Sequence, residues 1–240
     1  MSDADGKDAV GNAASHPLGF GRWRESLLSH PSGLLLGVQL IGVLLYPLME
    51  DTDAGRAVFG TFGIVVLALA LWVVNRSPTI NWVAWLLAVP SVAFSLLANL
   101  GGRAELLPVA YLLESALYFY AAAGLIAYML GDHRVTLDEL LAAGATFTLL
   151  AWAFAFAFLV CQAWYPGSFT AAIDPQQPRS WMELLFLSFS LLSSVGLSDI
   201  VPVTAPARAL AMMEMFGGVM YIAVVVSRLI ALTTLRMRRD

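Results

Sequence analysis

The sequence predicts an all-α membrane protein with six transmembrane helices and one short helix that enters the membrane and returns to the same side. Of the 240 residues, 59% are hydrophobic and only 12% are charged, and the mean hydropathy is +0.76. Soluble domains are far more polar than this. A helix needs about 20 mostly apolar residues to cross roughly 30 Å of hydrocarbon, so each long apolar run is a candidate span.

Six apolar runs are candidate spans, although the first is slightly short. They cover residues 33–48, 57–74, 80–100, 106–130, 140–164 and 205–232. The third run contains Pro90, which predicts a kink that a neighbouring helix can accommodate. Another apolar run, 181–192, has 12 residues and is too short to span. It predicts a re-entrant segment between the fifth and sixth spans.

The chain divides into three parts. Residues 1–30 are polar, small and rich in glycine, which predicts a partly disordered N-terminal segment. Residues 31–135 hold the first four spans, and residues 136–240 hold the remaining two with the re-entrant segment. Thr136 or Asp138 can cap the helix that begins the third part.

The basic residues set the predicted orientation, because positive charge is retained on the cytoplasmic side of short loops. With the N-terminus inside, nine of the thirteen Lys and Arg residues lie on that side: Lys7, Arg22, Arg24, Arg76, Arg134, Arg228, Arg236, Arg238 and Arg239. The outer set is Arg56, Arg103, Arg179 and Arg208. Both termini are therefore expected in the cytoplasm, and the re-entrant segment is expected to enter from outside.

The residue content argues against catalysis in the membrane. A serine nucleophile needs a nearby base, usually histidine. The three histidines, at 16, 30 and 133, all lie outside the predicted spans, so Ser198 has no evident base. The single cysteine, Cys161, rules out an internal disulfide. We expect no enzyme activity, no cofactor and no nucleic-acid partner.

The turn SSVGLSDIVP follows the re-entrant run directly. Irregular backbone at membrane depth is tolerated only where it is buried in protein or lines a water-filled cavity, because lipid cannot satisfy its N–H and C=O groups. The turn is therefore the candidate functional site. Its residues are Ser193, Ser194, Val195, Gly196, Leu197, Ser198 and Asp199.

The stretch from Met182 to Leu229 resembles the pore-loop potassium channel superfamily, in particular its bacterial six-span members. The family pattern Thr-Val-Gly-Tyr-Gly-Asp falls on residues 194–199 in order, with three identities. The resemblance implies a pore helix, a selectivity filter with K⁺ at the carbonyls of Ser194, Val195 and Gly196, and an inner helix. Gly217 and Gly218 lie where family members often carry a gating glycine. One chain has one such loop and a carbonyl ring needs several, so the resemblance implies a homotetramer.

Two departures from the pattern predict a degenerate filter. Leu197 replaces an aromatic residue and has no donor to hold the filter from behind. Ser198 replaces a glycine, and a left-handed conformation costs an L-residue about 1 to 2 kcal/mol, hence roughly 4 to 8 kcal/mol over four chains. We expect the outer filter to relax into another shape, with weakened selectivity for K⁺ over other monovalent cations. Four copies of Asp199 would concentrate cations at the outer mouth.

The first four spans resemble a voltage-sensor domain without its arginines. Span 106–130 contains no Lys or Arg, so we expect little voltage dependence. Its one ionisable residue, Glu114, is a candidate intramembrane switch, or else a carboxyl hydrogen-bonded to a tyrosine or another span. The resemblance implies a cation channel in the plasma membrane, here a bacterial inner membrane, surrounded by lipid. A non-conducting membrane subunit and a small secondary transporter are the alternatives.

Overall fold

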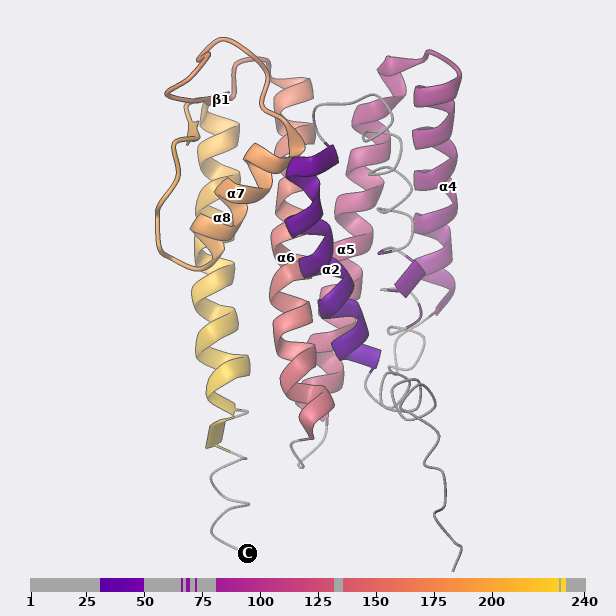
Figure 1. The fold of residues 1–240 in the computed structure, drawn as a ribbon, viewed down its shortest axis with the longest axis vertical. Coiled ribbons are helices and arrows are strands. Elements are labelled where there is room, and N and C mark those ends of the chain that lie inside the picture. Colours follow the sequence, from indigo (N-terminus) through magenta and orange to yellow (C-terminus); the bar gives the residue numbers. More distant parts are fainter. Residues whose placement is uncertain are drawn as a thin grey trace, which may run out of the picture.

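The computed structural model describes residues 31–49, 66, 68–69, 72, 81–131, 136–228 and 230–231. The predicted N-terminal segment, 1–30, and most of the second predicted span lie outside these residues. The described part is mostly helical, as the sequence predicts, and its long helices run side by side in a bundle (Figure 1).

The helices follow the apolar runs closely. They are α2 (Pro31–Met49), α4 (Asn81–Leu100), the 3₁₀ helix η1 (Ala104–Leu106), α5 (Leu107–Gly131), α6 (Leu137–Trp164), α7 (Trp181–Leu192), α8 (Ala205–Tyr221) and the π-helix η2 (Ile222–Val226). Two short strands, β1 (Phe169–Thr170) and β2 (Val201–Pro202), pair antiparallel with Phe169 opposite Pro202. The re-entrant run predicted at 181–192 has the same bounds as α7.

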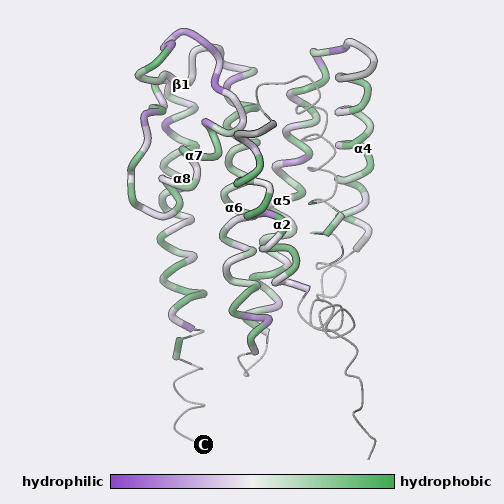
Figure 2. The backbone as a smooth tube through the Cα atoms, in the orientation of Figure 1, coloured by the Kyte–Doolittle hydropathy of each residue, from purple (hydrophilic) through white to green (hydrophobic). Residues whose placement is uncertain are grey.

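Three helical segments in the described part are long and apolar enough to cross a membrane: Ala104–Gly131, Leu137–Trp164 and Ala205–Val226. They correspond to the fourth, fifth and sixth predicted spans. α2 and α4 contain shorter apolar stretches, Pro31–Tyr46 and Trp82–Ala98. Figure 2 shows hydrophobic residues along most of each helix and a hydrophilic loop beside β1.

The start of α6 is fixed by a capping box. The side chain of Thr136 accepts a hydrogen bond from the Glu139 N–H at 3.3 Å, and Glu139 Oε2 accepts one from the Thr136 N–H at 3.2 Å. These bonds satisfy two N–H groups that a helix start leaves unpaired, which explains why α6 begins three residues before the predicted span. Of the two predicted caps, Thr136 is the one that acts.

Asp138 has another role, which is to attach α2 to α6. The Ser32 N–H and hydroxyl donate to the two Asp138 carboxylate oxygens at 3.2 and 3.0 Å. Leu36, one turn further along α2, contacts Gly144 of α6, where a Cβ would lie 2.9 Å from the leucine side chain. The small residue therefore allows α2 and α6 to approach closely.

Helix α6 lies at the centre of the fold and packs against α2, α5, α7 and α8. Its Trp152 is 1% exposed and meets two aromatic rings edge-on. The distance between ring centroids is 5.8 Å to Tyr118 on α5 and 5.1 Å to Trp181 on α7. Phe156, one turn later, stacks on Tyr118 at 5.7 Å. This cluster joins α5, α6 and the first turn of α7 in one core.

Replacing Trp152 with alanine tests this core. A buried aromatic side chain replaced by alanine costs about 3 to 5 kcal/mol, because it loses contacts and leaves a cavity. We expect Trp152→Ala to lower the unfolding free energy in detergent by that amount. The matched control is Trp164→Ala at the exposed end of α6, which should change it by less than about 1 kcal/mol. Equal losses of unfolding free energy in the two variants would contradict the placement of Trp152 in the core.

Candidate functional site

Helix α7 and the loop after it lie beside α8. α7 has 12 residues, about 18 Å of helix, and cannot cross the hydrocarbon. From its end the chain turns and runs back alongside α8 to the β1–β2 strand pair (Figure 1). Like α6, α7 starts with a capping box. The Ser180 hydroxyl accepts a hydrogen bond from the Glu183 N–H at 3.3 Å, and Glu183 Oε2 accepts one from the Ser180 N–H at 2.6 Å.

The end of α7 is a Schellman motif formed by the first loop residues. The Ser194 N–H donates to Leu191 O, and the N–H groups of Val195 and Gly196 both donate to Ser190 O, each at 3.1 Å. Ser194 takes the left-handed position that usually holds glycine in this motif, with φ 61°, and Gly196 follows with φ 71°. The last carbonyls of α7 are therefore partly satisfied by the loop that follows.

The backbone strain lies at Ser194 and not at Ser198, where the family pattern has glycine. Among the described residues, only Asp174 and Ser194 combine a side chain with positive φ. Ser198 avoids that conformation, and its hydroxyl accepts a hydrogen bond from the Ile200 N–H at 3.1 Å. The positive φ angles therefore fall at 194 and 196, two residues nearer α7 than the family pattern of glycines at 196 and 198.

The predicted site residues lie on a single exposed loop. Val195 and Leu197 are 68% and 71% exposed, Asp199 is exposed, and Ile200 returns to the core at 3%. No described residue donates a hydrogen bond to the carbonyl oxygens of Ser194, Val195 or Gly196. These three oxygens are the ones that the resemblance assigns to K⁺.

The exposed apolar surface continues along α8. Large side chains on the side of α8 away from α6 and α7 are between 44% and 62% exposed: Met212, Met213, Met215, Phe216, Val219 and Met220. The opposite side of α8 is buried at Ala211, Glu214 and Gly218. One face of α8 is thus packed within the chain, and the other is available to lipid or to another chain.

Hydrogen bonds hold the far end of the loop to the end of α6. The Ser168 hydroxyl donates to Tyr165 O at 2.6 Å and lies 2.9 Å from Thr204 Oγ1. Thr204 is also the N-cap of α8, and the Val203 N–H donates to Ser168 O at 2.9 Å. The loop exit, the start of α8 and the end of α6 therefore form one unit.

Arg179 organises the segment between β1 and α7. Only 4% of it is exposed, and its guanidinium pairs with Glu183 at 3.0 Å. It also donates to three backbone carbonyls, those of Ile173, Asp174 and Gln177. From the sequence, Arg179 is expected only as a positive charge on the outer side of the membrane. The signal that could have indicated its role is the opposite charge of Glu183 four residues later, although Arg179 lies before the extended N-cap Ser180 and outside the helix.

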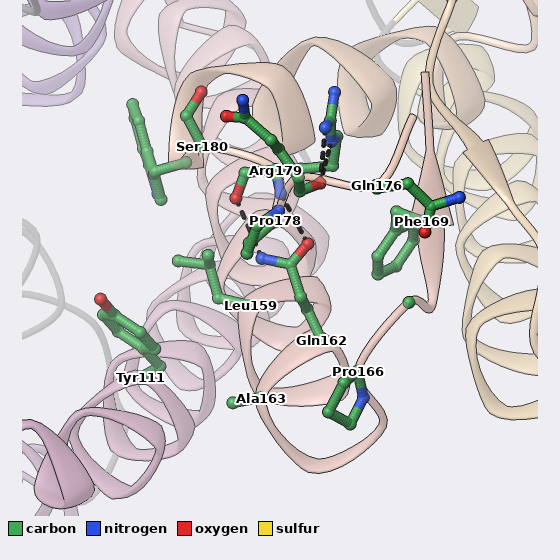
Figure 3. Close-up of a pocket in the computed structure, with 13 residues that line it drawn as sticks. Tyr111, Leu159, Gln162, Ala163, Pro166, Phe169, Gln176, Pro178, Arg179 and Ser180 are labelled. Atoms are coloured by element: carbon green, nitrogen blue, oxygen red, sulfur yellow. Dashed lines mark hydrogen bonds between the residues drawn. The ribbon is translucent and has the colours of Figure 1, made fainter. Parts of the chain in front are cut away.

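A pocket of about 540 Å³ lies between the ends of α5 and α6 and this segment (Figure 3). Tyr111, Leu159 and Phe169 are among its walls. Its Gln162 amide accepts from the Arg179 N–H at 2.7 Å and donates to Arg179 O at 3.0 Å (Figure 3). The Gln162 side chain is therefore engaged in holding the segment before α7.

Gly217 and Gly218, the candidates for a gating hinge, have different surroundings. A Cβ on Gly218 would overlap the backbone of Leu192, the last residue of α7, whereas a Cβ on Gly217 would meet nothing within 4 Å. One turn after Gly218, the Tyr221 hydroxyl donates to Ala143 O of α6 at 2.6 Å. Gly218 therefore serves the close approach of α8 to the end of α7, and helix η2 begins directly after Tyr221.

Glu114 lies half-buried on α5, between Tyr111 and Tyr118 on the same side of the helix. Within the described ranges it forms no ion pair. Tyr118 is engaged in the aromatic cluster with Trp152 and Phe156. The candidate switch is therefore set beside the core that joins α5 to α6.

The glycine pair gives a matched test. Gly218→Ala forces α8 away from Leu192, and overpacking of this kind costs about 1 to 3 kcal/mol. We expect a lower thermal unfolding midpoint in detergent. Gly217→Ala should leave the midpoint unchanged or raise it, because alanine is favoured over glycine within a helix by roughly 0.5 to 1 kcal/mol. If both variants unfold at the same temperature, the packing role of Gly218 is wrong.

The comparison with known families agrees with this geometry. A family model described as an ion channel matches residues 115–234, half of the chain. The matched region runs from α5 through α6, α7 and the exposed loop to α8. No curated protein and no solved structure matches the chain. The chain is a membrane protein that belongs to the ion channel family.

Proposed function

We propose that the chain forms a homotetrameric cation channel whose pore is built from residues 193–199 and the exposed face of α8. The observation that carries the proposal is the set of three backbone carbonyls, at Ser194, Val195 and Gly196, which receive no hydrogen bond from the described residues. Carbonyl oxygens arranged around an axis can replace the hydration shell of a cation such as K⁺.

Four copies around one axis would account for the exposed surface. A single chain supplies one loop, and a closed ring of carbonyls needs several. The exposed side chains of Val195 and Leu197, together with the methionine-rich face of α8, offer apolar surface for neighbouring copies and for lipid. Backbone that lacks helix or strand partners is tolerated at membrane depth only within protein or beside water.

The permeant ion is a monovalent cation, with K⁺ favoured but not strictly selected. Asp199 is exposed at the far end of the loop, and four copies would lower the energy of cations at the mouth. The glycine pattern of a strict filter is absent at Ser198, and the positive φ angles lie two residues nearer α7. A filter of that shape has fewer equivalent carbonyl sites, which would weaken the preference for K⁺. No cofactor is proposed.

The channel responds weakly to voltage, because α5 contains no Lys or Arg and its one charged residue is Glu114. Glu114 is the candidate switch in this domain. We place the channel in a bacterial inner membrane with both termini in the cytoplasm, as the distribution of basic residues favours. A purified chain that passes no current in bilayers would favour the non-conducting subunit instead, and stoichiometric coupled uptake without single-channel steps would favour the transporter.

Restoring the family pattern in the filter tests the selectivity. The double variant Leu197→Tyr, Ser198→Gly supplies a donor behind the filter and a residue that takes positive φ without cost. In planar bilayers under opposed K⁺ and Na⁺ gradients, we expect its reversal potential to move toward the K⁺ equilibrium potential by the equivalent of about a tenfold gain in discrimination, or 1.4 kcal/mol. An unchanged reversal potential would show that these two positions do not limit selectivity.

Neutralising the outer mouth tests the role of Asp199. We expect Asp199→Asn to reduce the unitary cation conductance in about 0.01 M salt, where the Debye length is about 30 Å, and to have little effect at 1 M, where it is about 3 Å. The control is Asp174→Asn, which neutralises an exposed carboxyl outside the 193–199 loop. A reduction by Asp199→Asn that is independent of salt would argue against an electrostatic role.

A further inference from the structure

Glu214 is a fully buried acid in the middle of α8. It is 0% exposed and lies on the side of α8 that packs against α7 and α6. The Ser188 hydroxyl of α7, also 0% exposed, hydrogen-bonds Glu214 Oε1. The same hydroxyl donates to Ala151 O of α6 at 2.8 Å. One chain of contacts thus joins α8, α7 and α6.

Counting protons identifies the state of Glu214. A serine hydroxyl carries one proton, and a backbone carbonyl carries none. When the Ser188 hydroxyl donates to Ala151 O, the contact between Ser188 and Glu214 needs a second proton. Only the Glu214 carboxyl can supply it, and a protonated carboxyl is a hydrogen-bond donor. A neutral Glu214 lets both contacts of Ser188 be hydrogen bonds, one donated to Ala151 O and one accepted from the carboxyl.

The surroundings agree with a neutral acid. Glu214 Oε2 has no hydrogen-bond partner among the described residues, and none of them forms an ion pair with the carboxyl. An ionised carboxylate buried without a cation is far more costly than a neutral one.

The charged groups on the neighbouring elements have other partners. Asp138 and Glu139, at the start of α6, bond Ser32 and Thr136, and Glu183, at the start of α7, pairs with Arg179. On α8 itself, Arg208 donates to Pro202 O. Helix η2 has no charged residue. None of these groups offers Glu214 a counter-charge.

We propose that Glu214 is a positioning residue for the ion pathway: as a neutral acid it donates to Ser188, Ser188 donates to Ala151 O, and this chain holds the end of α7 in place. The inference rests on the proposed function of the 193–199 loop. Ser190, two residues after Ser188, accepts the bonds from Val195 and Gly196, and Gly218, one turn after Glu214, lies against Leu192. A shift of α7 relative to α8 therefore moves the loop carbonyls.

Infrared difference spectroscopy tests the protonation. The infrared spectrum of the parent protein minus that of the Glu214→Gln variant should show the C=O stretch of a protonated carboxylic acid. Ser188→Ala removes the hydroxyl that accepts the carboxyl's hydrogen bond, so it should shift that band. Glu114→Gln is the matched control for the other acid within a membrane helix, and it should leave the Glu214 band in place. Absence of the band in the parent at neutral pH, or a carboxylate band in its place, overturns the inference.

Bilayer recordings test the positioning. Glu214→Gln keeps a neutral donor of similar size, so it should retain the parent's unitary conductance and reversal potential. Glu214→Leu and Ser188→Ala break the chain, and we expect them to change the cation permeability ratio or the open probability by about fivefold or more, the effect of one lost buried hydrogen bond. Parent-like conduction in both, or failure of Glu214→Gln alone, overturns the positioning role.

The two measurements separate the possible failures. The infrared band and its shift in Ser188→Ala do not depend on current. If the parent shows the band and its shift in Ser188→Ala but passes no current in bilayers, the hydrogen-bond chain is supported. The proposed channel function is then overturned, and the positioning role with it. A parent that conducts without the band overturns the inference and leaves the channel function standing.

Discussion

The candidate site depends on how the backbone N–H and C=O groups are satisfied where α7 ends after 12 residues. A helix satisfies its own N–H and C=O groups, and lipid cannot replace them. The Schellman motif resolves part of this requirement, because the N–H groups of residues 194–196 turn back to the last carbonyls of α7. The carbonyls of the same residues stay without a protein donor in the described chain. One constraint therefore fixes both the shape of the loop and the carbonyl oxygens that it leaves without a protein donor.

Long apolar runs and capping residues made much of the fold predictable. The bounds of α7 match the sequence prediction, and α5 and α8 begin within one residue of it. The apolar run alone places the start of α6 three residues late, because hydropathy registers Asp138 and Glu139 as polar, whereas the candidate cap Thr136 marks the start that the structure shows. Three of the six predicted spans correspond to segments of the described part with the length and composition of a span, and the count of six stays a prediction because most of 57–74 lies outside the described residues.

The candidate site was predictable in position but not in conformation. The motif at 194–199 located the exposed loop, yet the cost of positive φ falls on Ser194 and not on the residue that replaces glycine. Backbone angles depend on which carbonyl of α7 each N–H reaches, and no residue pattern encodes that choice. Glu214 was missed for a related reason, because a single acid in an apolar run gains meaning only when Ser188 and Ala151 are seen beside it.

Helix α2 is attached to the rest of the bundle near both of its ends. Ser32 bonds the start of α6, and Tyr46 lies 5.9 Å from the Trp181 ring at the start of α7. Two contacts about 14 residues apart, roughly 21 Å along a helix, oppose a pivot of α2 about either one alone. A tilt of α2 in a thinner or thicker bilayer would therefore tilt α6 with it and carry the first turn of α7.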